Sequence, residues 1–126
     1  MTYVDVRLPA VAGRFYPGDA AVLARDVAKY LGTPAPAPRL GLVAPHAGYM
    51  YSGGVAGKTF RRAKIPPQVV ILAPNHTGRG VRVSVLAAGA LRIPGADVPV
   101  DRGLVDRILA EVPGAQLDLR AHEREH

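Results

Sequence analysis

Leu40-Gly41-Leu42-Val43-Ala44-Pro45-His46 is the stretch that decides the predicted fold, and Val69-Val70-Ile71-Leu72-Ala73-Pro74-Asn75-His76 repeats its pattern further along the chain. Each apolar run is continuous, as expected for a strand that is buried on both faces of a sheet. The proline after each run lacks a backbone donor and ends the pairing. Residues 52–62 lie between the runs and favour a helix of small residues that packs close to the sheet. Strand, helix and strand in this order predict a βαβ unit with two parallel strands.

Two histidines follow the predicted strands at matching positions. Parallel strands end at the same edge of a sheet, so His46 and His76 should emerge there together, on loops where ligands bind. Imidazole is a common ligand of zinc, copper and ferrous iron. We therefore predict a metal-binding cleft, and the alternative is that one histidine caps a turn while the other is a surface residue. Tyr49, Tyr51 and Asn75 are predicted to line this cleft, unless the tyrosines fill the core and Asn75 makes a turn.

The remaining segments predict further helices and strands. Asp19 is expected to cap a helix over residues 22–31, and Asp101 to cap another over residues 104–112. Residues 81–85 alternate like a half-buried strand, and the glycines and prolines of residues 89–99 are typical of a hairpin. The expected fold is α/β, with a mainly parallel sheet flanked by helices, in a single domain over residues 1–126.

Composition disfavours several classes of protein. The 126 residues contain no cysteine, which excludes disulfides and thiolate metal ligands within this sequence. No apolar run approaches the ~20 residues that span a bilayer, and the first residues lack a signal pattern, so we expect no membrane association and a cytoplasmic protein. The net charge is +6, but the arginines are scattered without interleaved aromatics, which argues against nucleic-acid binding.

Two short motifs imitate known sites. Residues 52–59 end in the Gly-Lys-Thr of a phosphate loop, but Ser52 stands where the first glycine is required. Residues 122–126 read His-Glu-Arg-Glu-His, which satisfies the zinc-protease pattern but leaves His46 and His76 unexplained. We therefore favour neither nucleotide binding nor proteolysis, and expect residues 122–126 to be a solvated segment or to support the histidine site.

Several motifs together resemble the Memo family, whose bacterial and archaeal members are called AmmeMemoRadiSam system protein B. They are Ala44-Pro45-His46-Ala47-Gly48-Tyr49, Tyr51-Ser52-Gly53, Ala73-Pro74-Asn75-His76 and Glu123-Arg124-Glu125-His126, and residues 13–17 and 98–101 also fit. The resemblance covers about the N-terminal half of a usual member. It implies a three-layer α/β/α fold, incomplete here, that is similar to class III extradiol ring-cleavage dioxygenases, which hold ferrous iron with two histidines and a carboxylate.

The resemblance also implies a site and an activity. His46 and His76 would bind iron or copper, and the third ligand is expected outside this sequence. Glu125 and His126 are expected nearby as catalytic groups that support the ligands or transfer protons. The implied function is redox or dioxygenase-like, and the alternative is a non-enzymatic module that binds a peptide or partner in the same cleft. The implied partners are a radical S-adenosylmethionine enzyme and a third system protein, whereas the ligand, a small molecule or a peptide, is not identified by the resemblance.

Overall fold

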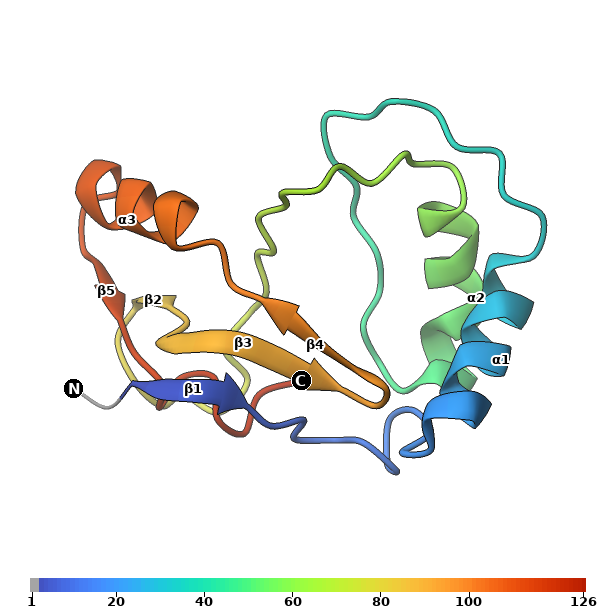
Figure 1. Cartoon of the computed structure of the whole chain (residues 1–126), viewed down its shortest axis with the longest axis horizontal. Coiled ribbons are helices and arrows are strands. Elements are labelled where there is room, and N and C mark those ends of the chain that lie inside the picture. Colours follow the sequence, from blue (N-terminus) through green and yellow to red (C-terminus); the bar gives the residue numbers. More distant parts are fainter. Residues whose placement is uncertain (1–2) are drawn as a thin grey trace. The chain divides into compact units, whose positions relative to one another are not determined.

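The computed structural model describes residues 3–126, which form two compact units. Residues 3–10 and 71–126 make up the strand unit, and residues 11–70 make up the helix unit. Helices and strands are both present, and two of the three strand pairings are parallel. The chain is therefore an α/β protein, as the sequence predicts (Figure 1).

The strand unit contains two small sheets. β1 (Val4–Arg7) lies parallel to β3 (Ala88–Ile93), which pairs antiparallel with β4 (Ala96–Pro99). β2 (Val83–Val85) and β5 (Ala115–Leu117) form a separate parallel pair. The predicted hairpin is confirmed as β3 and β4, and the strand expected over residues 81–85 is present in shorter form as β2.

Local interactions explain where the hairpin and the next helix begin. Gly95 adopts a positive φ of 95° between β3 and β4, a conformation that glycine takes without steric cost. Helix α3 (Arg102–Glu111) follows, and the Asp101 side chain accepts a hydrogen bond from the Leu104 backbone N–H at 2.9 Å. This is the N-cap that the sequence predicts. Val105 is the buried residue of α3, at 6% exposure.

The helix unit is a pair of helices, α1 (Ala20–Leu31) and α2 (Tyr49–Phe60), which lie against each other (Figure 1). The Asp19 side chain caps α1 through the Val22 backbone N–H at 2.9 Å, as predicted. Gly53 and Gly57 of α2 pack against Tyr30 of α1, where the sequence predicts packing on a sheet, and a Cβ atom on Gly57 would overlap the Tyr30 backbone. No helix within residues 3–126 is long and apolar enough to cross a membrane.

The two apolar runs that lead the fold prediction are not strands. Residues 40–44 and 69–73 have no regular secondary structure, and most of their large side chains are exposed. A doubly buried strand needs a hydrogen-bonded neighbour on each side, and residues 3–126 supply none to either run. The predicted βαβ unit is therefore wrong in both strands, although its helix is present as α2. The parallel pairs of the chain are β1 with β3 and β2 with β5.

Candidate metal site

The segment that carries His126 is a turn held by an arginine of β1. The His122 backbone N–H donates to the Leu119 carbonyl at 2.9 Å. The guanidinium of Arg7 donates to two carbonyl oxygens of this turn, those of His122 and Glu125, with its Nε atom 3.1 Å from the first. One planar fork thus binds two carbonyls at once and fixes the turn. The sequence does not mark Arg7 as a site residue, because its partners lie at the other end of the chain.

Glu125 is buried in the strand unit and accepts hydrogen bonds from His76. Its Oε2 atom accepts from the His76 backbone N–H at 2.7 Å, and its Oε1 atom lies 2.6 Å from Nδ1 of the His76 ring. The backbone N–H of His126 also donates to Oε1, at 3.3 Å. Burial by itself raises the pKa of the Glu125 carboxyl, but these hydrogen bonds outweigh it and lower the pKa to about 2.

The ionisation of Glu125 decides which ring nitrogen of His76 carries a proton. A carboxyl with a pKa of about 2 is ionised at neutral pH, and an ionised carboxylate only accepts hydrogen bonds. Nδ1 of His76 must therefore be the donor. When the imidazole is neutral, its other nitrogen, Nε2, then carries the lone pair that can ligate a metal ion.

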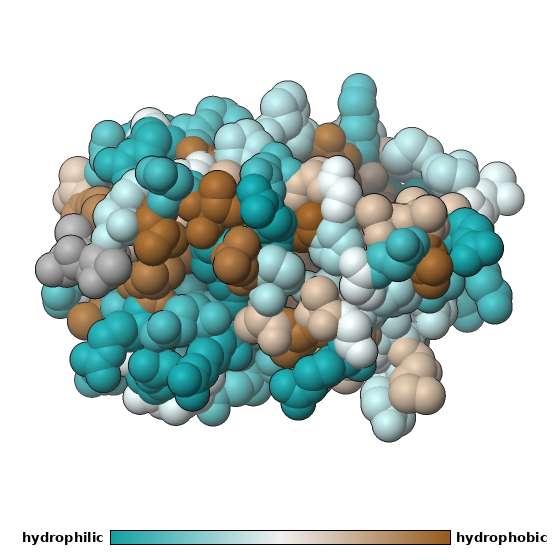
Figure 2. Space-filling view, turned by 60° about the horizontal axis from the view of Figure 1, so that its bottom comes forward, coloured by the Kyte–Doolittle hydropathy of each residue, from teal (hydrophilic) through white to brown (hydrophobic). Residues whose placement is uncertain are grey.

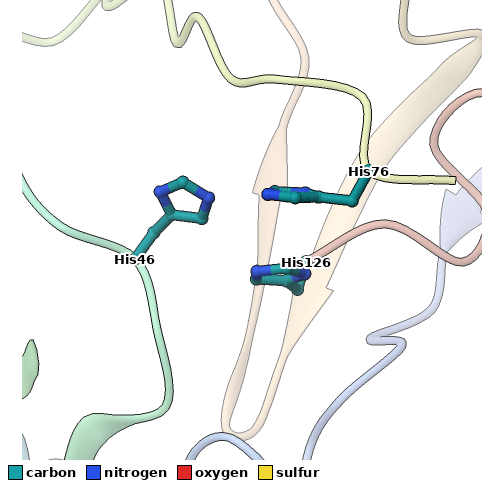
Figure 3. A group of neighbouring side chains, drawn as sticks. All are labelled: His46, His76 and His126. Carbon is teal, nitrogen blue, oxygen red and sulfur yellow. The ribbon is translucent and has the colours of Figure 1, made fainter. Parts of the chain in front are cut away.

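The rings of His76 and His126 lie face to face, with centroids 4.5 Å apart and an angle of 21° between their planes (Figure 3). Nδ1 of His126 is 3.4 Å from the same Oε1 atom of Glu125. One buried carboxylate therefore lies beside the Nδ1 atoms of both rings. This arrangement joins two predicted residues, His76 and His126, to the predicted Glu125.

His46 belongs to the helix unit and precedes α2. It lies in the coil that leads to Gly48, the N-cap of that helix, and it is exposed. His46, His76 and His126 each offer one imidazole nitrogen, and nitrogen donors of this kind suit copper, iron and zinc. Both His46 and His76 lie outside regular secondary structure, as predicted, but the strands predicted directly before them are absent.

The tyrosines predicted to line the cleft differ in exposure. Tyr49 packs in an aromatic cluster of the helix unit, with ring centroids 5.7 Å from Tyr16 and 5.9 Å from Tyr30. Burial and the two neighbouring tyrosines raise the pKa of the Tyr49 hydroxyl. Tyr51 is 81% exposed. Tyr49 thus contributes to packing between the helices, the alternative that the sequence left open.

Asn75 makes a turn directly before His76. Its Oδ1 atom accepts hydrogen bonds from the backbone N–H groups of Thr77 at 3.0 Å and Gly78 at 2.9 Å. Its side-chain amide donates to the Arg79 carbonyl at 2.7 Å. These bonds hold the loop after His76 and use the polar atoms of Asn75 within the backbone turn.

A second polar network supports the turn over residues 119–125. The buried Asp118 accepts from the backbone N–H groups of Val81 at 2.8 Å and Arg120 at 2.9 Å. Nε2 of His122 lies 2.8 Å from the Ser84 hydroxyl, and burial lowers the pKa of this imidazole. His122 is therefore engaged with β2, and residues 121–124 form a turn where the zinc-protease pattern needs a helix.

Comparisons with known proteins agree with the motif pattern. The profile of the family described as Memo-like protein matches residues 7–126. A MEMO1 family protein of Methanothermobacter thermautotrophicus is 41% identical over 135 residues, which cover 96% of this chain and 48% of that relative. A MEMO1 family protein of Aquifex aeolicus is 41% identical over 124 residues, covering 96% of this chain and 46% of the relative. The chain thus spans about half the length of the curated relatives that it matches.

Proposed function

This chain belongs to the Memo-like protein family, and on that premise we propose that it binds a redox-capable metal ion, iron or copper, through His46, His76 and His126. The observation that carries the proposal is the Glu125 carboxylate held against Nδ1 of His76. Histidines that ligate metals almost always donate their other ring N–H to a carboxylate, a carbonyl or water, which fixes the tautomer and raises the basicity of the ligand.

His126 takes a different role in this proposal from the one that the sequence suggests. Its ring is stacked on that of His76, and its Nδ1 atom faces the same carboxylate. Both imidazoles have their Nδ1 atom beside the same carboxylate, at 2.6 Å for His76 and 3.4 Å for His126, and this supports two metal ligands in preference to one ligand and one proton-transfer group. His46 completes the set because it follows an Ala-Pro pair, in the same way that His76 follows Ala-Pro-Asn.

The donors fit iron or copper by their chemistry. Three imidazoles suit copper, iron and zinc, whereas the Glu125 carboxylate is taken up by hydrogen bonds from His76 and His126. A bound iron or copper ion would supply one-electron or oxygen chemistry. The side chains of this chain would prepare the site for the ion. Glu125 keeps the proton on Nδ1 of His76, and Arg7 holds the turn that ends in His126.

Anaerobic titration tests the proposal. The chain is titrated with ferrous iron and with cuprous copper by calorimetry, beside the single variants His46→Ala, His76→Ala and His126→Ala. We expect one ion per chain, and an affinity at least roughly tenfold lower in each variant. His122→Ala is the matched control, because His122 contacts Ser84 and is not a proposed ligand.

Three results would contradict the three-histidine assignment. Wild-type affinity in His46→Ala would restrict the site to the strand unit. Equal losses in His122→Ala and His126→Ala would indicate a folding defect, which circular dichroism of the metal-free variants would detect. Absence of binding for both ions would refute the metal assignment. Oxygen uptake by the loaded chain then tests for redox activity separately from binding.

A further inference from the structure

Two segments without regular secondary structure expose large apolar side chains, and we call residues 40–44 and 69–73 the apolar segments. Leu40 and Val43 are 112% and 94% exposed, and Ile71 and Leu72 are 79% and 91% exposed. Apolar side chains lie open on the surface in Figure 2. Exposed large apolar side chains that gather on a protein surface often mark a site that another polypeptide, a membrane or a ligand covers.

The core of the chain has no large side chain that is fully buried within residues 3–126. Within the described residues 3–126, Ala87 and Ala88 are core residues with no exposed surface, and both are alanines. Buried alanines remove little apolar area from water, and the stabilisation from burial grows with that area. The chain therefore leaves much of its apolar surface without the packed layer that an α/β sheet requires on its faces.

The backbone of the apolar segments is also unpaired. No hydrogen bond joins the backbone of residues 40–44 or 69–73 to another group in the part of the chain that the structure describes. A segment with unpaired backbone groups and apolar side chains can pair with a strand from another polypeptide. Main-chain hydrogen bonds would supply affinity, and the exposed side chains would supply specificity.

The relatives indicate which polypeptide that is. The matched region covers 96% of this chain but only 48% of the Methanothermobacter protein, so the relative contains about as much polypeptide again. We propose that the apolar segments are strand-docking surfaces for the part of the family's chain that this sequence does not match. That part pairs with residues 40–44 and 69–73 and covers their side chains. The proposal does not depend on metal binding.

The decisive experiment co-expresses this chain with the unmatched part of the Methanothermobacter protein. We expect a one-to-one complex by light scattering, and hydrogen exchange at the amides of both apolar segments slowed by roughly 100-fold or more. Leu40→Lys and Leu72→Lys should abolish the complex, because each places a charge within the docked surface. Leu8→Lys is the matched control: Leu8 is 61% exposed but lies outside both segments.

Two outcomes with the separate chains overturn the proposal. A complex that forms without protection of the apolar segments, or equally well in the lysine variants, places the contact elsewhere. Protection in this chain alone that depends on its concentration assigns the surface to a second copy. If the separate part is insoluble, hydrogen exchange on the intact Methanothermobacter protein decides: fast exchange at the aligned segments refutes strand pairing, and slow exchange supports it.

Discussion

The Nδ1 atom of His76 lies 2.6 Å from Oε1 of Glu125, a residue 49 positions later in the chain. The same carboxylate accepts from the backbone N–H of His76 and reaches Nδ1 of His126 at 3.4 Å. It therefore ties the loop after residue 73 to the turn over residues 119–125. Because Glu125 is ionised at neutral pH, it sets the tautomer of His76 as well as its position.

The substitution Glu125→Gln should weaken metal binding about 10- to 100-fold. The amide keeps the size of the side chain but loses the charge that orients His76 and raises its basicity. Competition with a chromophoric chelator measures the change. Glu123→Gln is the matched control, because Glu123 is exposed and pairs with Arg79 instead. Equal affinities in wild type and Glu125→Gln would remove Glu125 from the site.

The guanidinium of Arg7 should be needed for the stability of the strand unit. Arg7→Met removes hydrogen bonds to the carbonyls of His122 and Glu125, and leaves those part-buried oxygens without this donor. Hydrogen bonds from charged groups contribute about 1.5–3 kcal/mol each, and two carbonyls lose their donor, so we expect a loss of at least roughly 3 kcal/mol in the free energy of unfolding. Urea denaturation measures it. Arg124→Met, at an exposed position of the same turn, should change the midpoint little.

Gly80 lies where a side chain does not fit. Its φ is +81°, and an added Cβ atom would overlap Oδ2 of Asp118 and lie 2.8 Å from the Cβ of Ala121. Gly78 has a similar φ of +67° but open space around it. Gly78→Ala should therefore cost about 1 kcal/mol from backbone strain alone. Gly80→Ala should cost roughly 2 kcal/mol more from overpacking, measured by thermal unfolding. Equal losses would mean that Asp118 moves aside.

The sequence predicts the elements whose causes are local. Asp19 and Asp101 cap their helices through the backbone N–H three residues later, so the signal lies within a few residues. The hairpin is marked by the glycine at its turn in the same way. The runs at 40–44 and 69–73 have the composition of buried strands, but a strand also needs a partner. That partner is absent from residues 3–126, so composition alone predicts two strands that do not form there.

The site follows the same division between local and distant causes. His46, His76, Glu125 and His126 are all noticed in the sequence, because their residue types and motifs are unusual. Two sets of hydrogen bonds join parts that are far apart in the chain. One connects His76 with Glu125, and the other connects Arg7 with the carbonyls of residues 122 and 125. No spacing rule connects such residues, and only the fold brings them together.

Asp118 should make stability depend on acid pH. Burial raises the pKa of its carboxyl, but hydrogen bonds from Val81 and Arg120 and the charges of Arg120 and His122 outweigh this and lower it. A carboxyl with a lower pKa in the folded state contributes stability above its unfolded value, about 4, and loses it as the pH falls through the folded value. The urea concentration at the midpoint of unfolding should therefore decrease when the pH is lowered below about 4.

The substitution Asp118→Asn identifies the group responsible for that drop. The variant should be less stable than wild type at pH 6 and should approach it as the pH falls below about 4, because the wild-type carboxyl is then losing its charge. Asp106→Asn on the exposed surface of α3 is the control and should follow the wild-type curve. Parallel curves for wild type and Asp118→Asn would assign the acid sensitivity to other carboxyls.

The close approach of α1 and α2 should depend on glycines of α2 and above all on Gly57. An added Cβ atom on Gly57 would overlap the carbonyl group of Tyr30, which is backbone and cannot turn aside. Gly54 lies in the same helix, is exposed and has nothing within 4 Å of an added Cβ. Gly54→Ala should stabilise the helix unit by up to about 1 kcal/mol, because alanine is the better helix former.

Gly57→Ala should have the opposite sign from Gly54→Ala, although the gain in helix propensity is the same. The helices must separate to admit the methyl group, which costs roughly 1–3 kcal/mol and opens the cluster of Tyr16, Tyr30 and Tyr49. Tyrosine fluorescence during urea unfolding reports both the change in the free energy of unfolding and the change in the environment of the tyrosine cluster. If both alanine variants are stabilising, the helices tolerate a wider spacing, and the glycines of residues 53–57 do not set their distance.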